Sequence, residues 1–395
     1  EEGMHFVQHY SGSTVCAPSR STLLTGQHTG YTPIRGNKQW GYLLNWPMPD
    51  ETVTIAEVLK ENGYATACYG KWGLGFDEMS SANDQGFDEF YGFYNQRVAH
   101  HYYPYYIWHN EEKIYFEENE EDKEGLYVPE YMQDRLLEFI ERKKDSSFFI
   151  YYANIIPHAE LFAPEEYMEK FRGKLLPEVS YEGTDYGDER FREGPYGSQP
   201  EAHAAFAAMV TYLDDQVGEI YEKLKELGLD DNTMIIFTSD NGPHKEGGAD
   251  PDYFNSNGPY RGYKRDLYEG GIRVPMFVWY PPKVEANSST GHISAFWDVF
   301  PTFAELAGAE IPDNINGISF VPTLFGEGEQ EEHDYMYWEF HERGGKVAIL
   351  KDNWKLIVMN TMREGQKKFE LYNLDEDPGE MNDLSETNPE IVEEL

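Results

Sequence analysis

The sequence predicts an α/β fold in which helices flank a large, mostly parallel sheet, followed by a small antiparallel α+β subdomain at the C-terminal end. Two observations carry this prediction. Helical and strand-like segments alternate between residues 50 and 308, which is the order that builds parallel sheets. From about residue 327 the chain changes to short aromatic and β-branched runs, which indicate antiparallel strands. We therefore expect two units, residues 1–326 and residues 327–395.

The individual elements follow from local patterns. Apolar residues at helical spacing, ended by glycine or preceded by a capping residue, predict helices over residues 50–62, 131–144, 201–227 and 298–308. Apolar runs predict strands over residues 64–69, 148–153, 233–239 and 276–280, the third of them central because its run is continuous. Residues 335–340, 347–350, 354–358 and 369–374 are the predicted C-terminal strands. Loops are expected over residues 30–49, 111–124 and 164–200, the second of them acidic and solvated.

Composition indicates a folded and strongly acidic protein. Of the 395 residues, 40% are hydrophobic and 15% aromatic, so the charge does not indicate disorder. The chain has 72 acidic and 32 basic residues and a net charge of −40, which argues against a nucleic acid or an anionic membrane surface as partner. No apolar stretch has the length of a membrane span.

Cys16 lies where a short helix is predicted to begin. Pro18 suits the first helical turn and Gly26 suits the end of the helix. The helix N-terminus and Arg20, four residues further on, both favour negative charge at the sulfur. Cys16 is therefore either a catalytic residue or a small buried residue in a strand-to-helix turn. Cys68 lies in a predicted buried strand, so no disulfide framework is expected.

Polar residues follow the predicted strands at their carboxyl ends, where α/β folds gather functional groups. Lys71 and His158 each stand just past a strand; a lone lysine is otherwise a solvated charge, and a lone histidine is otherwise structural. Asp240 and Asn241 cap the strand over residues 233–239. Their oxygens suit a hard cation such as calcium, although Asp-Asn-Gly is also a common turn sequence.

Residues 86–108 are dense in aromatic side chains and include Arg97, His100 and His101. Aromatic faces with a few hydrogen-bonding cations suit the binding of sugar rings, including sulfated ones. The alternative is an aromatic-rich packed loop.

The segment Cys16-Ala17-Pro18-Ser19-Arg20, which continues to Leu-Leu-Thr-Gly, resembles the Cys-x-Pro-x-Arg signature of type I sulfatases in the alkaline phosphatase-like superfamily. The resemblance implies that a maturing enzyme oxidises Cys16 to formylglycine. One hydroxyl of the hydrated aldehyde would attack the sulfur of a sulfate ester, and the other would later lose its proton and expel sulfate. Arg20 would neutralise charge on the sulfuryl oxygens.

Later segments resemble the same family in the expected order. Gly70-Lys71-Trp72-Gly73-Leu74-Gly75 is similar to the family's Gly-Lys-Trp-His-Leu-Gly element, with Gly73 in place of the histidine. Residues 258–275 are similar to its Gly-x-Lys-x-x-x-x-Glu-Gly-Gly segment. The resemblance implies that Lys71 and Lys264 contact the sulfate and that His158, in a Pro-His element, donates to the sulfate or its leaving oxygen.

The resemblance also implies a calcium ion bound by Asp240, Asn241 and the modified Cys16, and a substrate contact from His244. The family begins with a strand that ends in a metal-binding Asp-Asp pair, and we expect that strand to precede Glu1 and the natural chain to extend beyond residue 395. The expected partners are a sulfated carbohydrate or another sulfate ester and the formylglycine-generating enzyme, and the expected location is periplasmic or secreted.

Two alternatives remain open. Related folds hydrolyse phosphate or phosphonate esters with the same aldehyde. A catalytically silent relative that binds sulfated glycans is the other, motivated by Gly73 and by the absence of the Asp-Asp pair from this sequence.

Overall fold

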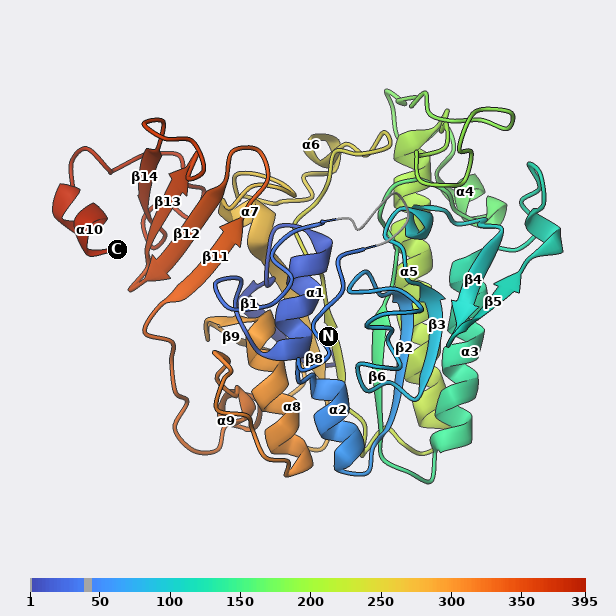
Figure 1. Ribbon diagram of the computed structural model, residues 1–395, viewed down its shortest axis with the longest axis horizontal. Helices are drawn as coiled ribbons and strands as arrows, with labels where there is room; N and C mark the ends of the chain where they lie inside the picture. The colour runs from blue at the N-terminus through green and yellow to red at the C-terminus, as the bar shows by residue number, and fades with distance from the viewer. Residues whose placement is uncertain (1, 39–44) are drawn as a thin grey trace.

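The strands of the protein form two five-stranded sheets and one four-stranded sheet in a computed structural model that describes residues 2–38 and 45–395 (Figure 1). The α/β class and the C-terminal antiparallel sheet are confirmed. The first sheet has the order β10 (Ser294–Ala295), β1 (Met4–Tyr10), β8 (Arg273–Trp279), β7 (Ile235–Thr238), with β9 (Ser288–Thr290) also paired to β1. The second has the order β5 (Glu112–Tyr115), β4 (Tyr106–His109), β3 (Glu89–Phe93), β2 (Ala65–Lys71), β6 (Phe148–Ala153).

The strands expected in one large, mostly parallel sheet are thus divided between two mixed sheets. Strand β2 pairs in parallel with β3 and β6, whereas β8 pairs antiparallel with β1 and β7. Strands β6 and β7 are the edges of their sheets, and both line a cavity of about 1720 Å³. Strand β7 was expected to be central, but among the described strands it lies at the end of its sheet, with half-buried side chains.

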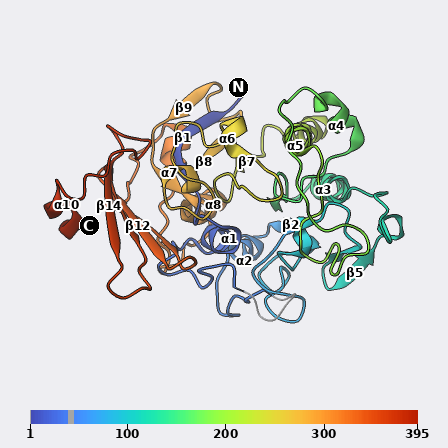
Figure 2. The ribbon, with the colours of Figure 1, turned by 90° about the horizontal axis from the view of Figure 1, so that it is seen from above.

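Helices cover both faces of these sheets (Figure 2). Helices α1, α2 and α8 pack on one side with Phe6 of β1 and Cys68 of β2, while α3 and α5 pack on the other side with Tyr69 of β2. The helices are α1 (Cys16–Thr25), α2 (Ile55–Glu61), α3 (Val128–Lys143), α4 (Glu165–Phe171), α5 (Ala202–Glu226), α6 (Pro251–Phe254), α7 (Glu269–Ile272), α8 (Val299–Ala307), α9 (Val321–Phe325) and α10 (Pro389–Glu394). Short 3-10 turns are η1 (Val98–His100), η2 (Glu117–Asn119) and η3 (Phe296–Asp298).

The predicted long helices and buried strands form within a few residues of their expected bounds. Helix α2 begins later than expected because Thr54 caps it: its hydroxyl accepts from the Glu57 N–H at 3.2 Å, and the Glu57 carboxylate accepts from the Thr54 N–H at 2.7 Å. Gly308, in the left-handed region at φ 67°, ends α8 as predicted. Cys68 is fully buried, as expected, and burial raises the pKa of its thiol.

Two predicted loops contain regular structure instead. The acidic loop over residues 111–124 includes strand β5, which pairs with β4 and places Ile114 against the buried core. The irregular stretch over residues 164–200 includes α4, where Met168 is buried and acidic residues occupy the first turn. Residues 39–44 of the loop expected over residues 30–49 lie outside the described residues. Within the described ranges, no helix is long and apolar enough to span a bilayer.

The C-terminal sheet has the order β11 (Met336–Phe340), β12 (Lys346–Lys351), β13 (Trp354–Met359), β14 (Lys368–Asn373), all antiparallel. It packs through Trp338 on Tyr10 of β1, with ring centroids 5.2 Å apart. Lys355 of β13 is fully buried and forms ion pairs with Glu269 at 2.8 Å and Glu380 at 2.9 Å. The sheet is therefore joined by apolar and ionic contacts to the segment that follows Lys264.

Candidate active site

Cys16 begins helix α1, as the sequence predicted. Val15 stands before it in an extended conformation, and Gly26 ends the helix at φ 66°. The N–H of Ala17, in the first turn, donates to Asn37 Oδ1 at 3.0 Å. The Cys16 thiol is buried and lies 3.7 Å from Asn241 Oδ1. The positive end of the helix is thus directed toward the turn that follows β7.

Arg20 joins the first turns of α1 to two strand ends. Its Nε and Nη2 each donate to Asp240 Oδ2 at 3.1 Å, and its Nη1 donates to the Lys71 carbonyl oxygen. Burial alone would lower the pKa of Arg20, but the Asp240 carboxylate outweighs it and the pKa is raised. Arg20 is therefore a permanent cation that orients Asp240 and the end of β2.

Lys71 ends strand β2 and is buried. Gly70 allows this close packing, because at φ 100° a Cβ there would lie 2.1 Å from the Ala153 carbonyl oxygen of β6. Burial is the main cause that lowers the pKa of Lys71 to about 8, and the cations Arg20 and Lys264 act in the same direction. The ammonium is charged at neutral pH and ready to bind an anion.

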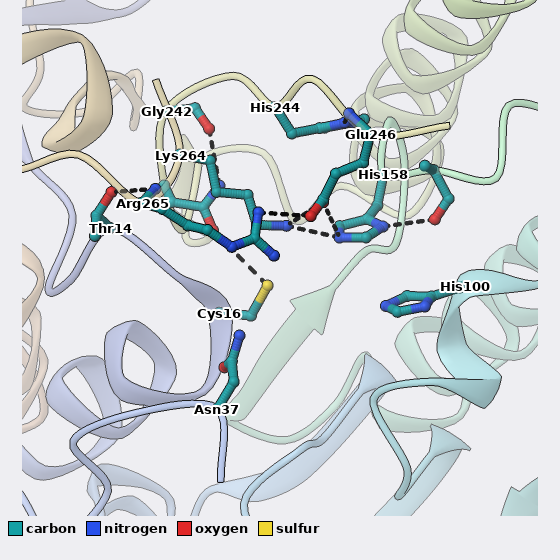
Figure 3. A network of polar contacts seen from close by, with 12 residues as sticks. Thr14, Cys16, Asn37, His100, His158, Gly242, His244, Glu246, Lys264 and Arg265 are labelled. Atoms are coloured by element: carbon teal, nitrogen blue, oxygen red, sulfur yellow. Dashed lines mark hydrogen bonds and ion pairs between the residues drawn. The ribbon is translucent and has the colours of Figure 1, made fainter. Parts of the chain in front are cut away.

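Lys264 lies between a histidine and a carboxylate (Figure 3). Its Nζ donates to His158 Nε2 at 2.8 Å and to Glu246 Oε2 at 3.0 Å, and Arg265 Nη1 lies 2.5 Å from Glu246 Oε1. Burial alone would raise the pKa of Glu246, but Lys264 and Arg265 outweigh it and lower the pKa to about 2. The result is a cluster of two cations and one carboxylate beside the imidazole.

The contacts of His158 define its protonation state. Its Nδ1 donates to the Ala159 carbonyl oxygen at 2.5 Å, so Nε2 is the acceptor for Lys264. The pKa of His158 lies well below its usual range, chiefly through burial and then through Lys264 and His100. In this state the imidazole is neutral and accepts a hydrogen bond from Lys264.

Two predicted substrate-binding histidines flank His158. The ring of His100 stacks on His158 with centroids 4.6 Å apart, and the ring of His244 lies on it at 5.2 Å. The Nε2 of His244 donates to the Pro157 carbonyl oxygen at 3.0 Å. Burial, aided by Lys264, lowers the pKa of His244 to about 4, so a neutral histidine stack lines this wall.

His101 and Arg97, the other two predicted substrate-binding residues, both contact Gly194. Both ring nitrogens of His101 are engaged, Nδ1 with Glu160 at 3.1 Å and Nε2 with the Gly194 N–H at 2.9 Å. His101 is buried and supports the loop instead of offering a nitrogen to substrate. Arg97 packs against Gly194, where a Cβ would lie 3.0 Å from the Arg97 Cβ. Arg97 and His100 therefore share a wall with the 194–197 segment.

The aromatic segment over residues 86–108 is mainly core, which favours the packed alternative. Phe87, Phe90, Phe93, Tyr94, Tyr102 and Tyr103 are buried. The aromatic ring that does lie beside the histidines is Tyr196, whose centroid is 5.1 Å from His100. No local pattern singled out Tyr196 in the sequence.

Glu246 and Arg265 are the site residues that sequence reasoning missed. They adjoin motif positions, Glu246 two residues after His244 and Arg265 next to Lys264. Arg265 has a φ of 79°, which is uncommon for a residue with a side chain. Neither the ion pair between them nor this backbone conformation has a signal in sequence spacing.

Glycines bring the two turns of the site together. A Cβ at Gly242 would lie 2.0 Å from the Gly270 carbonyl oxygen, and the Gly242 N–H donates to the Gly271 carbonyl oxygen at 3.0 Å. The Asp-Asn-Gly and Glu-Gly-Gly sequences therefore pack backbone against backbone. Gly73 has a φ of 74°, and a Cβ there would lie 3.0 Å from Gln96 Cγ, so the backbone at this position favours glycine.

The oxygens of Asp240 and Asn241 are of the type that calcium binds. Calcium takes about six to eight oxygen ligands. The described residues contain no group of three or more His, Cys, Asp or Glu side chains that could hold a metal ion. The donor chemistry fits, and the donor number is incomplete within the residues that the structure describes.

Family models match the chain along its whole length. The model described as Sulfatase matches residues 1–309, and the model described as N-sulphoglucosamine sulphohydrolase, C-terminal, matches residues 260–395.

Curated relatives of this chain also include sulfatases. The N-acetylgalactosamine-6-sulfatase of Homo sapiens is 28% identical, covering 100% of this chain and 77% of the relative. An arylsulfatase of Hemicentrotus pulcherrimus is 29% identical, covering 94% and 63%. The structure of Ps i-CgsB superimposes with a TM-score of 0.79 at 27% identity, covering 99% of this chain and 82% of that chain. The phosphonate monoester hydrolase of Silicibacter pomeroyi shares the fold at 17% identity, with a TM-score of 0.66 and coverage of 99% and 86%.

The matched signature, the convergence of its residues and the coverage of the family models lead to one assignment: the chain belongs to the sulfatase family of the alkaline phosphatase-like superfamily and is a sulfuric ester hydrolase.

Proposed function

We propose that the enzyme removes sulfate from a sulfated glycan, with a formylglycine made from Cys16 as nucleophile and with Ca²⁺ as cofactor. The observation that carries the proposal is convergence. Five distant parts of the chain meet here: Asn241 and Arg20 connect Cys16, Lys71 and Asp240, while Lys264 pairs with His158 and donates its N–H to the Pro243 carbonyl oxygen just after Asn241 and Gly242. Several cations close to the buried N-terminus of one helix suit the binding of an anionic ester.

Lys71 and Lys264 are the cations directed at the substrate. Arg20 is committed to Asp240 and to the Lys71 carbonyl, so it acts by holding these groups in place. The two ammonium groups neutralise charge that spreads over the sulfuryl oxygens during transfer. The hydrated aldehyde at position 16 supplies the nucleophilic oxygen once the residue is modified.

His158 and Lys264 handle the proton for the departing alcohol. In the free site Lys264 donates to a neutral His158. An anionic sulfate beside the pair favours the imidazolium, because an opposite charge stabilises the charged form; Nε2 would take its second proton from solvent, and the Lys264 ammonium would turn from Nε2 to the sulfate. His158 then becomes a donor toward the leaving oxygen, the role expected from its Pro-His element.

Asp240 and Asn241 are the residues that would hold calcium, which acts as a Lewis acid when bound. Arg20 keeps the Asp240 carboxylate in place for this role. Further oxygen ligands would be needed to complete the coordination of calcium.

A glycan substrate is supported by the aromatic wall beside His158. His100 and Tyr196 offer an aromatic surface beside His158, and Arg97 lies on the same segment as His100. Aromatic faces and polar hydrogen-bonding groups suit sugar rings. Ps i-CgsB, at 27% identity, has been solved in complex with k-i-k-neocarrahexaose, and the human relative is named for N-acetylgalactosamine 6-sulfate.

The proposal includes a sulfatase-maturing enzyme as partner and a periplasmic or secreted location, both from the family resemblance. We also assign residues 1–326 to the catalytic domain and residues 327–395 to a C-terminal subdomain. Strands β11–β14 all lie in the latter.

The test compares turnover of an aryl sulfate, an aryl phosphate and a panel of sulfated oligosaccharides, using the full natural chain produced with the maturing enzyme. The proposal predicts release of sulfate from one oligosaccharide class and loss of turnover in Lys264→Ala. The matched control is Lys245→Ala, an exposed lysine paired with Asp252 at 2.6 Å, which should keep wild-type turnover. Preference for the phosphate ester, or retention of glycans without desulfation, would establish the alternatives instead.

A further inference from the structure

The turn that carries Lys264 is held from three sides. The Lys264 N–H donates to the Pro243 carbonyl oxygen at 2.9 Å, beyond β7. The Arg265 N–H donates to Thr14 Oγ1 at 2.8 Å, two residues before Cys16. The Arg265 carbonyl oxygen accepts from Lys346 Nζ at 2.9 Å, and Lys346 belongs to β12 of the C-terminal sheet.

Lys346 makes a second contact with the same turn. Its Nζ also pairs with Asp266 Oδ1 at 2.9 Å, and its side chain is only 13% exposed. One ammonium group thus bonds a carbonyl and a carboxylate on adjacent residues, and bonds to charged groups are the stronger kind. These contacts fix the position of the Arg265 peptide relative to β12.

The held residue is strained. Arg265 has a φ of 79°, a conformation that costs free energy for a residue with a side chain and persists only when its surroundings impose it. A change of φ at Arg265 rotates the preceding peptide, which bears Lys264. The Lys264 ammonium would then leave its 2.8 Å contact with His158.

We infer that Lys346 is a positioning residue: from the C-terminal sheet it holds the Arg265 turn in its left-handed conformation and so places Lys264 for sulfate transfer. The inference rests on the proposed role of Lys264. It gives the C-terminal sheet a part in catalysis, carried by one side chain.

The experiment compares Lys346→Met, Lys346→Arg and Lys351→Met, with kcat, KM and Tm measured on an aryl sulfate. Lys351 is the matched control, because it lies on the same strand, is 37% exposed and pairs with Glu394 at 2.6 Å. Misplacement of a catalytic group by about 1 Å lowers the rate by up to about 100-fold. We expect kcat of Lys346→Met to fall about 10- to 100-fold, Lys346→Arg to recover most of it, and Lys351→Met to match wild type.

Lys346→Met also leaves the Asp266 carboxylate without its cation. The double variant Lys346→Met/Asp266→Asn removes that charge, and the inference predicts the same loss of kcat with a Tm close to that of wild type. A kcat within twofold of wild type in this double variant would overturn the inference, as would a loss that Lys346→Arg fails to recover.

A double-mutant cycle separates the inference from the proposed role of Lys264. If Lys346 acts through Lys264, then Lys346→Met causes no further loss in a Lys264→Ala background. If Lys264→Ala is fully active, the proposed role of Lys264 fails. If Lys264→Ala is impaired and Lys346→Met adds its full effect, the positioning inference fails while the role of Lys264 stands.

Discussion

The lowered pKa of Lys71 leads to a pH dependence that can be worked out from the structure. Burial, with Arg20 and Lys264 nearby, lowers the pKa from 10.5 to about 8, although Cys16 acts in the opposite direction. A group with this pKa is about 90% protonated at pH 7 and about 10% protonated at pH 9. Because only the ammonium attracts the sulfate, kcat/KM should fall about tenfold between pH 7 and pH 9.

The direction of the pH effect and the kinetic parameter that shows it both follow from the ionisation of Lys71. The charged form is lost as pH rises through the folded pKa, so the decline is on the alkaline side. The parameter kcat/KM reports ionisation of the free enzyme. Bound sulfate stabilises the ammonium, so the alkaline decline of kcat should begin at higher pH than that of kcat/KM.

The assay measures kcat/KM against pH for wild type, Lys71→Arg and Lys71→Met on an aryl sulfate. Arginine stays charged throughout this range, so Lys71→Arg should lose the alkaline decline even if its maximum is lower. Lys71→Met should be weak at all pH values. An alkaline decline that is unchanged in Lys71→Arg would refute the assignment of that ionisation to Lys71.

Three further predictions concern other parts of the site and its support. Asp240→Asn removes the carboxylate that Arg20 holds, and kcat/KM should fall about 100- to 1000-fold, with weaker calcium binding by titration calorimetry. Gly242→Ala places a Cβ 2.0 Å from a carbonyl oxygen, so turnover should fall at least about tenfold, while an alanine at the open position Gly218 should leave it unchanged. Lys355→Met leaves two buried carboxylates without their cation, so the free energy of unfolding should fall by about 3–5 kcal/mol. Calorimetry should show this as a lower Tm, whereas Lys351→Met should leave the Tm unchanged.

The elements that were predictable are those with a strong local pattern. Helix α5 has a clear helical periodicity and strand β6 has an unbroken apolar run, and both form at nearly the predicted residues. Strand β7 shows the limit of such reasoning. Its apolar run indicates burial on both faces, but a run does not identify the neighbouring strand, and among the described strands β7 lies at the end of its sheet.

The site was predictable where the motif residues follow strands, since parallel strand ends meet at one edge of a sheet. Lys71 and His158 follow the paired parallel strands β2 and β6 in this way, whereas Asp240 follows β7 of the other sheet and is joined to Lys71 through Arg20. Glu246 and Arg265 were not predictable, because their ion pair depends on two loops that meet only in the folded chain. His101 was predicted as a substrate contact because it lies in the aromatic segment over residues 86–108, yet its ring nitrogen Nδ1 is engaged with Glu160.

The proposed mechanism depends on the conversion of residue 16 to an aldehyde that acts as the nucleophile. Mass spectrometry of the peptide bearing residue 16, on enzyme produced with the maturing machinery, tests this most directly when turnover is measured on the same sample. The account predicts that the thiol mass is replaced by that of formylglycine in proportion to activity. An unmodified Cys16 thiol in soluble enzyme that still hydrolyses sulfate esters would contradict it.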